Sequence, residues 1–245
     1  MIWTIARREI TSMFLSPLAW VILAVIQAIL GYMFLAQIEQ YYMLQPQLIQ
    51  LENTPGVTDI VVAPIFSLAS IILLMIMPLI TMRSLAEEKK SKTITLLFSA
   101  PISITQLVLG KFTGLMLFVL ILIGLLMLMP LSLLLGTDLD LGKLLSIFIA
   151  MVLLLGSFAS IGLYLSSLTD NQTIAAVSTF GALLMLWILE WNTESTVFHY
   201  LSLLAHHQPL LEGVFDSTDI SYFLLIILLF LGLTVRKLDG DRLQN

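Results

Sequence analysis

The sequence predicts an all-α integral membrane protein, with six transmembrane helices and an amphipathic N-terminal helix at the membrane surface. Of its 245 residues, 59% are hydrophobic and 11% are charged, whereas soluble domains have about 45–50% apolar and about 25% charged residues. The mean hydropathy is +1.02. A water-soluble fold cannot bury that much apolar surface, so lipid must cover it. The chain has no cysteine, which excludes disulfides and thiolate metal sites.

Residues 1–15 predict a helix that lies on the membrane surface. At helical spacing the apolar side chains share one face and the polar ones share the opposite face. The apolar face consists of Trp3, Ala6, Ile10, Met13 and Phe14. The polar face consists of Thr4, Arg7, Arg8, Thr11 and Ser12. Ser16-Pro17 then offers a break before the first span. The alternative is that residues 1–15 are only the frayed start of that span.

Six stretches are long enough and low enough in charge to cross about 30 Å of hydrocarbon. They are residues 17–38, 64–82, 112–135, 144–165, 173–189 and 221–235. No cleavable signal peptide is evident, because the first span follows a charged segment and no small-residue cleavage site comes after it. We expect residues 1–245 to form one domain.

The basic residues between the spans predict the orientation. Of the 11 lysines and arginines, Lys143 alone falls on one side of the membrane. The other ten share the opposite side: Arg7, Arg8, Arg83, Lys89, Lys90, Lys92, Lys111, Arg236, Lys237 and Arg242. Because basic loops stay on the cytoplasmic side, both termini are expected in the cytoplasm.

The last external segment, residues 190–220, is expected to contain a short helix at the outer surface. His199, His206 and His207 lie there, near two glutamates. Histidine and carboxylate can hold a metal, and an interfacial or substrate-entry role is a second alternative. The simplest interpretation is that they are ordinary loop histidines, and we expect no metal.

The cytoplasmic segment 83–111 carries the most functional information. Its first part, Arg83-Ser-Leu-Ala-Glu-Glu-Lys-Lys-Ser-Lys-Thr, predicts a helix that leaves the second span and ends near Pro101. Glu88 and Lys92 have the i,i+4 spacing of a weak ion pair. A short charged helix held rigidly against the bilayer is suited to docking on a soluble partner. A solvated cytoplasmic loop is an equally good interpretation from the residues alone.

Three groups of motifs resemble ABC-2 type permeases. The first group joins the Arg83 segment to Leu96-Leu97, Ser99-Ala100-Pro101 and Leu109-Gly110-Lys111-Phe112. The second group is Leu165-Ser-Ser-Leu-Thr-Asp-Asn-Gln172 with Ala175-Ala176. The third group is Gly213-Val-Phe-Asp216 with Asp219 and Tyr222-Phe223. They cover most of the chain in the right order, and the likeness is greatest to gliding-motility-type permeases. The sequence departs from the family at Lys92, commonly glycine, and at Thr95, commonly an acid.

The resemblance implies the ABC-2 permease fold, of the type V-like kind, and a half-transporter in the bacterial inner membrane. Two such subunits, identical or related, would form the pathway, and two cytoplasmic ATPase subunits would bind ATP and Mg and power it. An external or membrane-anchored accessory protein is a further partner to consider, and no nucleic acid is expected.

By the same resemblance, the helix after the second span sits in a cleft of the ATPase. The residues that would couple it are Arg83, Glu87, Glu88, Lys89, Lys90, Thr93, Leu97 and Pro101. A second, smaller contact would come from Asp170, Asn171 and Gln172.

No catalytic residue and no nucleotide site is expected in the chain itself. Gly110-Lys111 matches the last pair of a phosphate-binding loop, but Thr105 and Phe112 stand where that loop needs Gly and Ser or Thr. Gly110 and Gly114 instead have the spacing that lets two helices approach closely, and we expect them to pack within the subunit.

Other functions were weighed against this one. A secondary transporter keeps ionisable groups inside the bilayer, and the six spans have none away from their ends. An intramembrane enzyme is disfavoured for the same reason. A subunit that anchors an ABC-like complex without moving anything stays open. The cargo is not specified, although uniformly apolar spans favour a lipidic or amphipathic substrate over a small ion.

Overall fold

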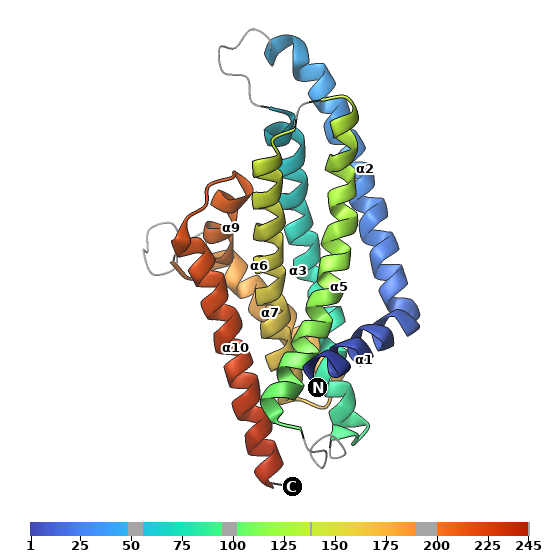
Figure 1. Cartoon of the computed structure of the whole chain (residues 1–245), viewed down its shortest axis with the longest axis vertical. Coiled ribbons are helices and arrows are strands. Elements are labelled where there is room, and N and C mark those ends of the chain that lie inside the picture. Colours follow the sequence, from blue (N-terminus) through green and yellow to red (C-terminus); the bar gives the residue numbers. More distant parts are fainter. Residues whose placement is uncertain (49–55, 95–101, 138, 190–199, 245) are drawn as a thin grey trace.

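The computed structural model describes residues 1–48, 56–94, 102–137, 139–189 and 200–244. In these ranges every regular element is a helix, which confirms the all-α class. Most of the long helices run along the long axis of the molecule, and both termini lie toward the same end (Figure 1). That end also carries the last turns of α3 and the first turns of α5, and we call it the basic end.

The long helices are followed along the chain by the bounds that the structure gives them. They are α2 (Pro17–Leu48), α3 (Ala63–Lys90, after a π-helical turn at Thr58–Val62), α5 (Ile104–Ser132, before a 3-10 turn at Leu133–Leu135), α6 (Leu141–Leu168), α7 (Gln172–Ile188) and α10 (Ser217–Gln244). Two shorter helices, α1 (Ile2–Leu15) and α9 (Leu203–Leu211), complete the described part of the chain.

Five helical stretches in these ranges are long and apolar enough to cross a membrane. They are Pro17–Pro46, Thr58–Lys90, Ile104–Leu135, Leu141–Leu168 and Ser217–Leu243. Helix α7 coincides with the predicted fifth span, but it has 17 residues, which is about the shortest length that spans hydrocarbon. Several helices run past the predicted spans, as α2 does from residue 38 to Leu48, because hydropathy marks the lipid boundary and not the end of the helix.

Helix α6 lies at the centre of the bundle. It is the most buried of the five membrane-length stretches and contacts α3, α5, α7, α9 and α10. Its buried face includes the small residues Ser157, Ser160 and Gly162. A Cβ atom at Gly162 would overlap the Thr81 side chain of α3, so small residues allow the close approach of these two helices.

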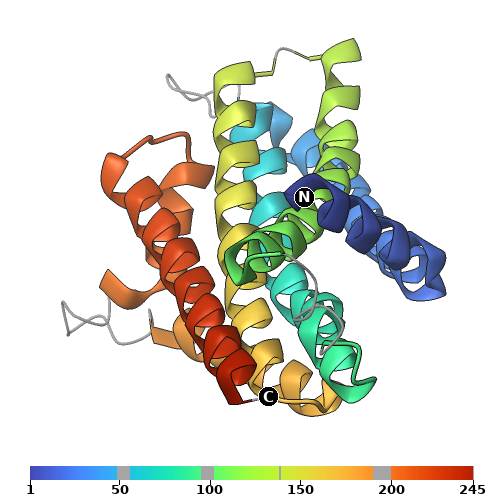
Figure 2. The same ribbon diagram turned by 60° about the horizontal axis from the view of Figure 1, so that its bottom comes forward.

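The predicted break between the N-terminal helix and the first span is present. Helix α1 ends at Leu15, Ser16 has extended backbone, and α2 begins at Pro17. Helix α1 packs on α5, which it crosses in Figure 2, and Ala6 of α1 is buried. A Cβ atom at Gly110 or Gly114 would lie 2.7 Å from the Cβ of Ile5 or Glu9. The expected packing of this glycine pair within the subunit is therefore confirmed, and it fixes α1 to the bundle.

The helix that leaves the second span ends earlier than predicted. Helix α3 stops at Lys90, not near Pro101. Lys92 then has φ 57°, and the N–H groups of Ser91 and Lys92 bond back to the carbonyls of Glu87 and Lys89. A left-handed residue just after a helix is a common stop signal and favours glycine, which gives a physical reason for glycine at this position in ABC-2 type sequences.

The short external helix is also placed differently from the prediction. Helix α9 is not a surface helix, because Leu203, His206, His207, Leu210 and Leu211 are buried. It contacts α6, α10 and α3, and Ser146 of α6 donates to the Leu210 carbonyl at 2.6 Å. Its periodic apolar face needed a partner, and the bundle supplies one. His199 lies outside the described residues.

Candidate functional site

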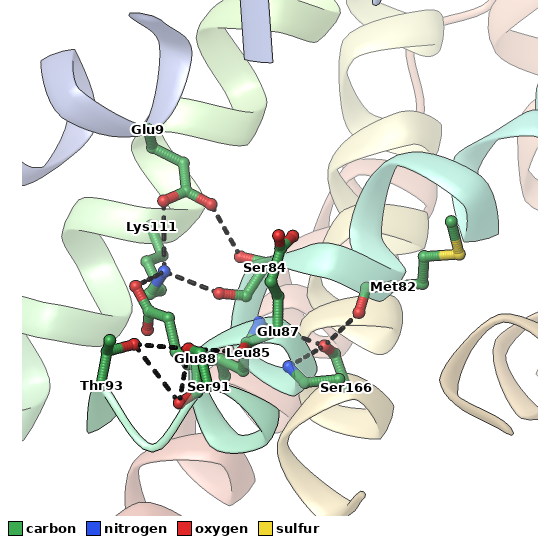
Figure 3. A network of polar contacts seen from close by, with 11 residues as sticks. Glu9, Met82, Ser84, Leu85, Glu87, Glu88, Ser91, Thr93, Lys111 and Ser166 are labelled. Carbon is green, nitrogen blue, oxygen red and sulfur yellow. Dashed lines mark hydrogen bonds and ion pairs between the residues drawn. The ribbon is translucent and has the colours of Figure 1, made fainter. Parts of the chain in front are cut away.

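A buried lysine at the basic end joins three helices (Figure 3). The side chain of Lys111 in α5 is only 2% exposed. Its Nζ donates to Glu9 Oε2 of α1 (3.1 Å), to Glu88 Oε1 of α3 (2.9 Å) and to the Ser84 carbonyl of α3 (2.7 Å). An ammonium group has three N–H donors, and these three acceptors match them. We call Glu9, Ser84, Glu88 and Lys111 the charge cluster.

The local sequence explains how the charge cluster forms. Gly110 and Gly114 let α1 approach α5, which brings Glu9 to the side chain of Lys111. Ser84 and Glu88 lie four residues apart and so share one face of α3. Glu9 is held further by the Ser84 hydroxyl, which donates to its Oε1 at 3.2 Å.

The charge cluster is not fully neutral or fully satisfied. It contains two carboxylates and one ammonium group, at side-chain exposures of 17%, 19% and 2%. Among the described residues, Glu88 Oε2 is buried and has no hydrogen-bond partner. Removing charges from water has a cost that only close partners offset, so the lysine is essential to keeping these two carboxylates where they are.

The end of α3 is also bound to α6 and α10. The Ser166 hydroxyl of α6 accepts hydrogen bonds from the N–H groups of Leu85 (3.2 Å) and Ala86 (3.0 Å) and donates to the Met82 carbonyl (3.1 Å). Lys89 Nζ donates to the Ser167 carbonyl (2.5 Å) and to Asp241 Oδ2 of α10 (2.6 Å). Together with the charge cluster, these contacts tie the last two turns of α3 to four other helices.

The predicted coupling residues fall into two groups in the structure. Arg83, Glu87, Lys90 and Thr93 are exposed. Glu88 and Lys89 are half-buried and turned toward the bundle, where they make the ion pairs described above. Leu97 and Pro101 lie outside the described residues.

The second predicted contact lies close to the first. Asp170 and Asn171 are exposed in the turn between α6 and α7, and Asn171 caps α7 by accepting from the Thr173 N–H at 3.0 Å. Gln172 is half-buried as the first residue of α7. Because the turn directly follows Ser166 and Ser167, which bond to α3, both predicted contacts belong to one joined surface at the basic end.

Two buried histidines far from this surface were not anticipated. His206 Nδ1 lies 2.6 Å from Asp219 Oδ1, and His207 Nε2 lies 2.8 Å from Ser70 Oγ of α3. Burial lowers the pKa of His207 to about 3, so its ring is neutral. Interpreting these two as ordinary loop histidines is therefore wrong. The sequence indication of this burial was a pair of consecutive histidines on a short apolar helix that begins after a capping serine.

Neither histidine builds a reaction centre in the described part of the chain. The Ser70–His207 pair has the atoms of a nucleophile and a base, but both side chains are fully buried and His207 Nδ1 has no hydrogen-bond partner there. In the same ranges no three His, Asp or Glu side chains gather as metal ligands. Lys143, the one lysine or arginine that lies outside the basic end, pairs with Asp59.

The family model for ABC-2 family transporter proteins matches residues 3–235. The chain belongs to the ABC-2 transporter family. It is accordingly a multi-pass membrane protein and a permease subunit of an ABC transporter. A search of curated proteins found no match. The match runs from α1 into α10 and includes the whole charge cluster; the likeness to gliding-motility-type permeases stays a prediction.

In this ABC-2 permease the last turns of α3 have two different sides. One side of the last turns of α3 is exposed, and the other is held by Lys111, Ser166 and Asp241. A displacement applied to the exposed side would therefore move α1, α5, α6 and α10 with α3.

Proposed function

We propose that this ABC-2 permease is an exporter subunit driven by a separate cytoplasmic ATPase, which docks on the exposed side of the α3 end. The observation that carries the proposal is the two-sided character of this helix end. Its exposed residues Arg83, Glu87 and Lys90 alternate with Ser84, Glu88 and Lys89, which are bound to the rest of the bundle.

The partner supplies the chemistry that the permease does not contain. Two ATPase subunits bind ATP and Mg, and two permease subunits, identical or related, enclose the pathway. The Asp170–Asn171 turn adds a smaller contact beside the α3 end. The uniformly apolar membrane-length helices favour a lipidic or amphipathic cargo.

The orientation follows from charge. Ten of the 11 lysines and arginines belong to the basic end, so this end is the cytoplasmic side and both termini are cytoplasmic. The family membership favours a bacterial inner membrane. The absence of cysteine allows a direct test with introduced thiols. Gly136→Cys, at an exposed residue in the turn between α5 and α6, should react with an impermeant reagent from outside intact cells, and Lys90→Cys should not. The reverse labelling would overturn the orientation.

The docking proposal is tested by charge reversal on the exposed side alone. We expect Glu87→Lys and Lys90→Glu to reduce co-purification of the ATPase, or its stimulation by the permease, because both side chains are exposed at the proposed contact. Glu88→Lys is unsuitable, since it would break the charge cluster. Arg7→Glu is a matched control, because Arg7 is exposed on α1 at the same end.

The readouts are the amount of ATPase that co-purifies with the tagged full-length permease and its rate of ATP hydrolysis. Helical content and monodispersity in detergent report whether each variant is folded. A wild-type level of ATPase binding and hydrolysis in both Glu87→Lys and Lys90→Glu would contradict the proposal. A functional complex that hydrolyses ATP but exports nothing would show an anchoring subunit instead.

A further inference from the structure

A cavity of about 340 Å³ lies between α1, α2, α3 and α5 at the basic end, beside the elbow formed by Ser16 and Pro17. This volume is within the range of ligand-binding pockets, about 300–1,000 Å³. Part of the wall is apolar and consists of Met13, Leu18, Ala19, Ile22, Ile80 and Phe118. The rest is charged and includes Arg8, Arg83 and Glu87 together with the charge cluster. The cavity is therefore amphipathic.

The charged part of the wall can bind both signs of charge. Three cations (Arg8, Arg83 and Lys111) and three carboxylates (Glu9, Glu87 and Glu88) line it, which makes the wall neutral when all six are ionised. Lys111 is already bound to Glu9 and Glu88, so the two arginines are the cations that remain for a ligand. Arginine binds phosphate through parallel N–H donors, and Arg83 uses Nη1 on Ser16 Oγ at 3.2 Å.

A second observation points to a ligand that also donates hydrogen bonds. Glu88 lines the cavity, and its Oε2 is buried without a hydrogen-bond partner among the described residues. A buried carboxylate oxygen that lacks a donor is costly. If the Glu88 carboxylate rotates toward the cavity, a primary ammonium group supplies N–H donors to it and to the exposed Glu87. A quaternary ammonium would not, because it has no N–H.

The location suits a lipid. The cavity lies at the elbow between α1 and the first membrane-length helix. Trp20 lies beside this elbow, and its Nε1 donates to the Phe14 carbonyl at 2.9 Å. Tryptophan is enriched at the level of lipid headgroups. The three parts of the wall thus match the three parts of a phospholipid. The apolar wall suits an acyl chain, the arginines suit the phosphate, and the unpartnered carboxylate suits the amine.

We propose that this cavity holds the headgroup and the first part of one acyl chain of a phospholipid with a phosphoethanolamine headgroup, drawn from the leaflet at the basic end. Its phosphate binds Arg8 and Arg83, its ammonium group donates to Glu87 and Glu88, and an acyl chain lies along Leu18, Ile22 and Phe118. The lipid is a resident ligand that fills the space between α2 and the rest of the bundle. Arg83 and Glu87 belong to both proposed sites, but lipid retention is measured on the permease without its ATPase, and Lys90, which does not line the cavity, tests docking alone.

The test is lipid retention by the purified full-length permease, measured by native mass spectrometry. The protein is exchanged into detergent that contains equal amounts of phosphatidylethanolamine, phosphatidylcholine and phosphatidylglycerol. We expect one phosphatidylethanolamine per chain, retained about tenfold better than phosphatidylcholine, which lacks the N–H donors. Soluble glycerophosphoethanolamine should not displace it, because the apolar wall binds the acyl chain.

Variants at the wall separate this site from general lipid adhesion. Arg83→Gln and Glu87→Gln should each lower retention about tenfold, and Ser12→Trp should abolish it by filling the cavity. Arg7→Gln and Lys90→Gln are matched controls, since both residues are exposed neighbours that do not line the cavity. Equal retention in wall variants and controls, equal retention of the three lipids, or displacement by the soluble headgroup would each overturn the proposal.

Discussion

Removing the buried ammonium group of Lys111 is the sharpest test of the packing at the basic end. Lys111→Met keeps a long apolar side chain but leaves Glu9 and Glu88 facing one another without the cation that now lies 3.1 Å and 2.9 Å from them. Breaking a buried ion pair by removing one partner costs about 3–5 kcal/mol. Because the two carboxylates are 17% and 19% exposed and keep some access to water, we expect the lower limit, about 3 kcal/mol.

The measurement is the free energy of unfolding of the full-length permease in mixed micelles, followed by tryptophan fluorescence and helical circular dichroism. Glu88→Gln should cost less than Lys111→Met, because Glu9 and Lys111 still neutralise one another. A triple variant with Glu9→Gln, Glu88→Gln and Lys111→Met removes every charge and should recover most of the loss. Lys111→Met within about 1 kcal/mol of the wild type would refute the reasoning, since a surface ion pair contributes no more than this.

Three further predictions follow from single positions. Lys92→Gly should stabilise the permease by about 0.5–1 kcal/mol, because only glycine adopts φ 57° without strain; Lys92→Ala, which keeps the strain, should not. Gly114→Ala should lower the free energy of unfolding by about 2 kcal/mol, because its Cβ would force α1 away from α5. Gly124→Ala should leave it unchanged, because no neighbouring atom lies within 4 Å of the added Cβ. Equal effects of the two substitutions would contradict the close approach of α1 and α5. The pKa of His207 falls from 6.5 to about 3 on folding. As the pH falls, His207 therefore binds a proton in the unfolded chain before it does so in the folded protein, and stability declines below about pH 6.5. Between pH 7.5 and pH 5 the decline is about 2 kcal/mol, and His207→Gln should remove it from the unfolding curve.

Much of the fold could be predicted because it depends on properties that act locally along the chain. The apolar runs located the membrane-length helices, and Ser16-Pro17 marked the end of α1, since proline disfavours helix in the residue before it. The glycine spacing in α5 predicted a helix contact. Motif order was sufficient to indicate the ABC-2 family. Helix ends were less accurate, because the stop at Lys90 depends on one left-handed residue that has no glycine to mark it.

The site could be predicted only in outline. Charged residues after the second span indicated a docking segment, but composition could not separate Glu87, which is exposed, from Glu88, which is bound to Lys111. That difference depends on which face of α3 meets α5. The cavity beside the elbow likewise exists only because four helices converge there, and no segment of the sequence contains it.

The sequence by itself determined that this protein spans the membrane as helices, which end carries the basic residues, and where the family motifs lie, because hydropathy and helical periodicity act over a few turns. The tertiary structure alone decided that Lys111 meets Glu9, 102 positions away along the chain, and that His207 enters the bundle beside Ser70. Pairing of buried polar groups depends on three-dimensional packing, since any carboxylate or hydroxyl of the right reach could have served. The packed helices give Lys111 and His207 partners that offset part of the cost of their removal from water.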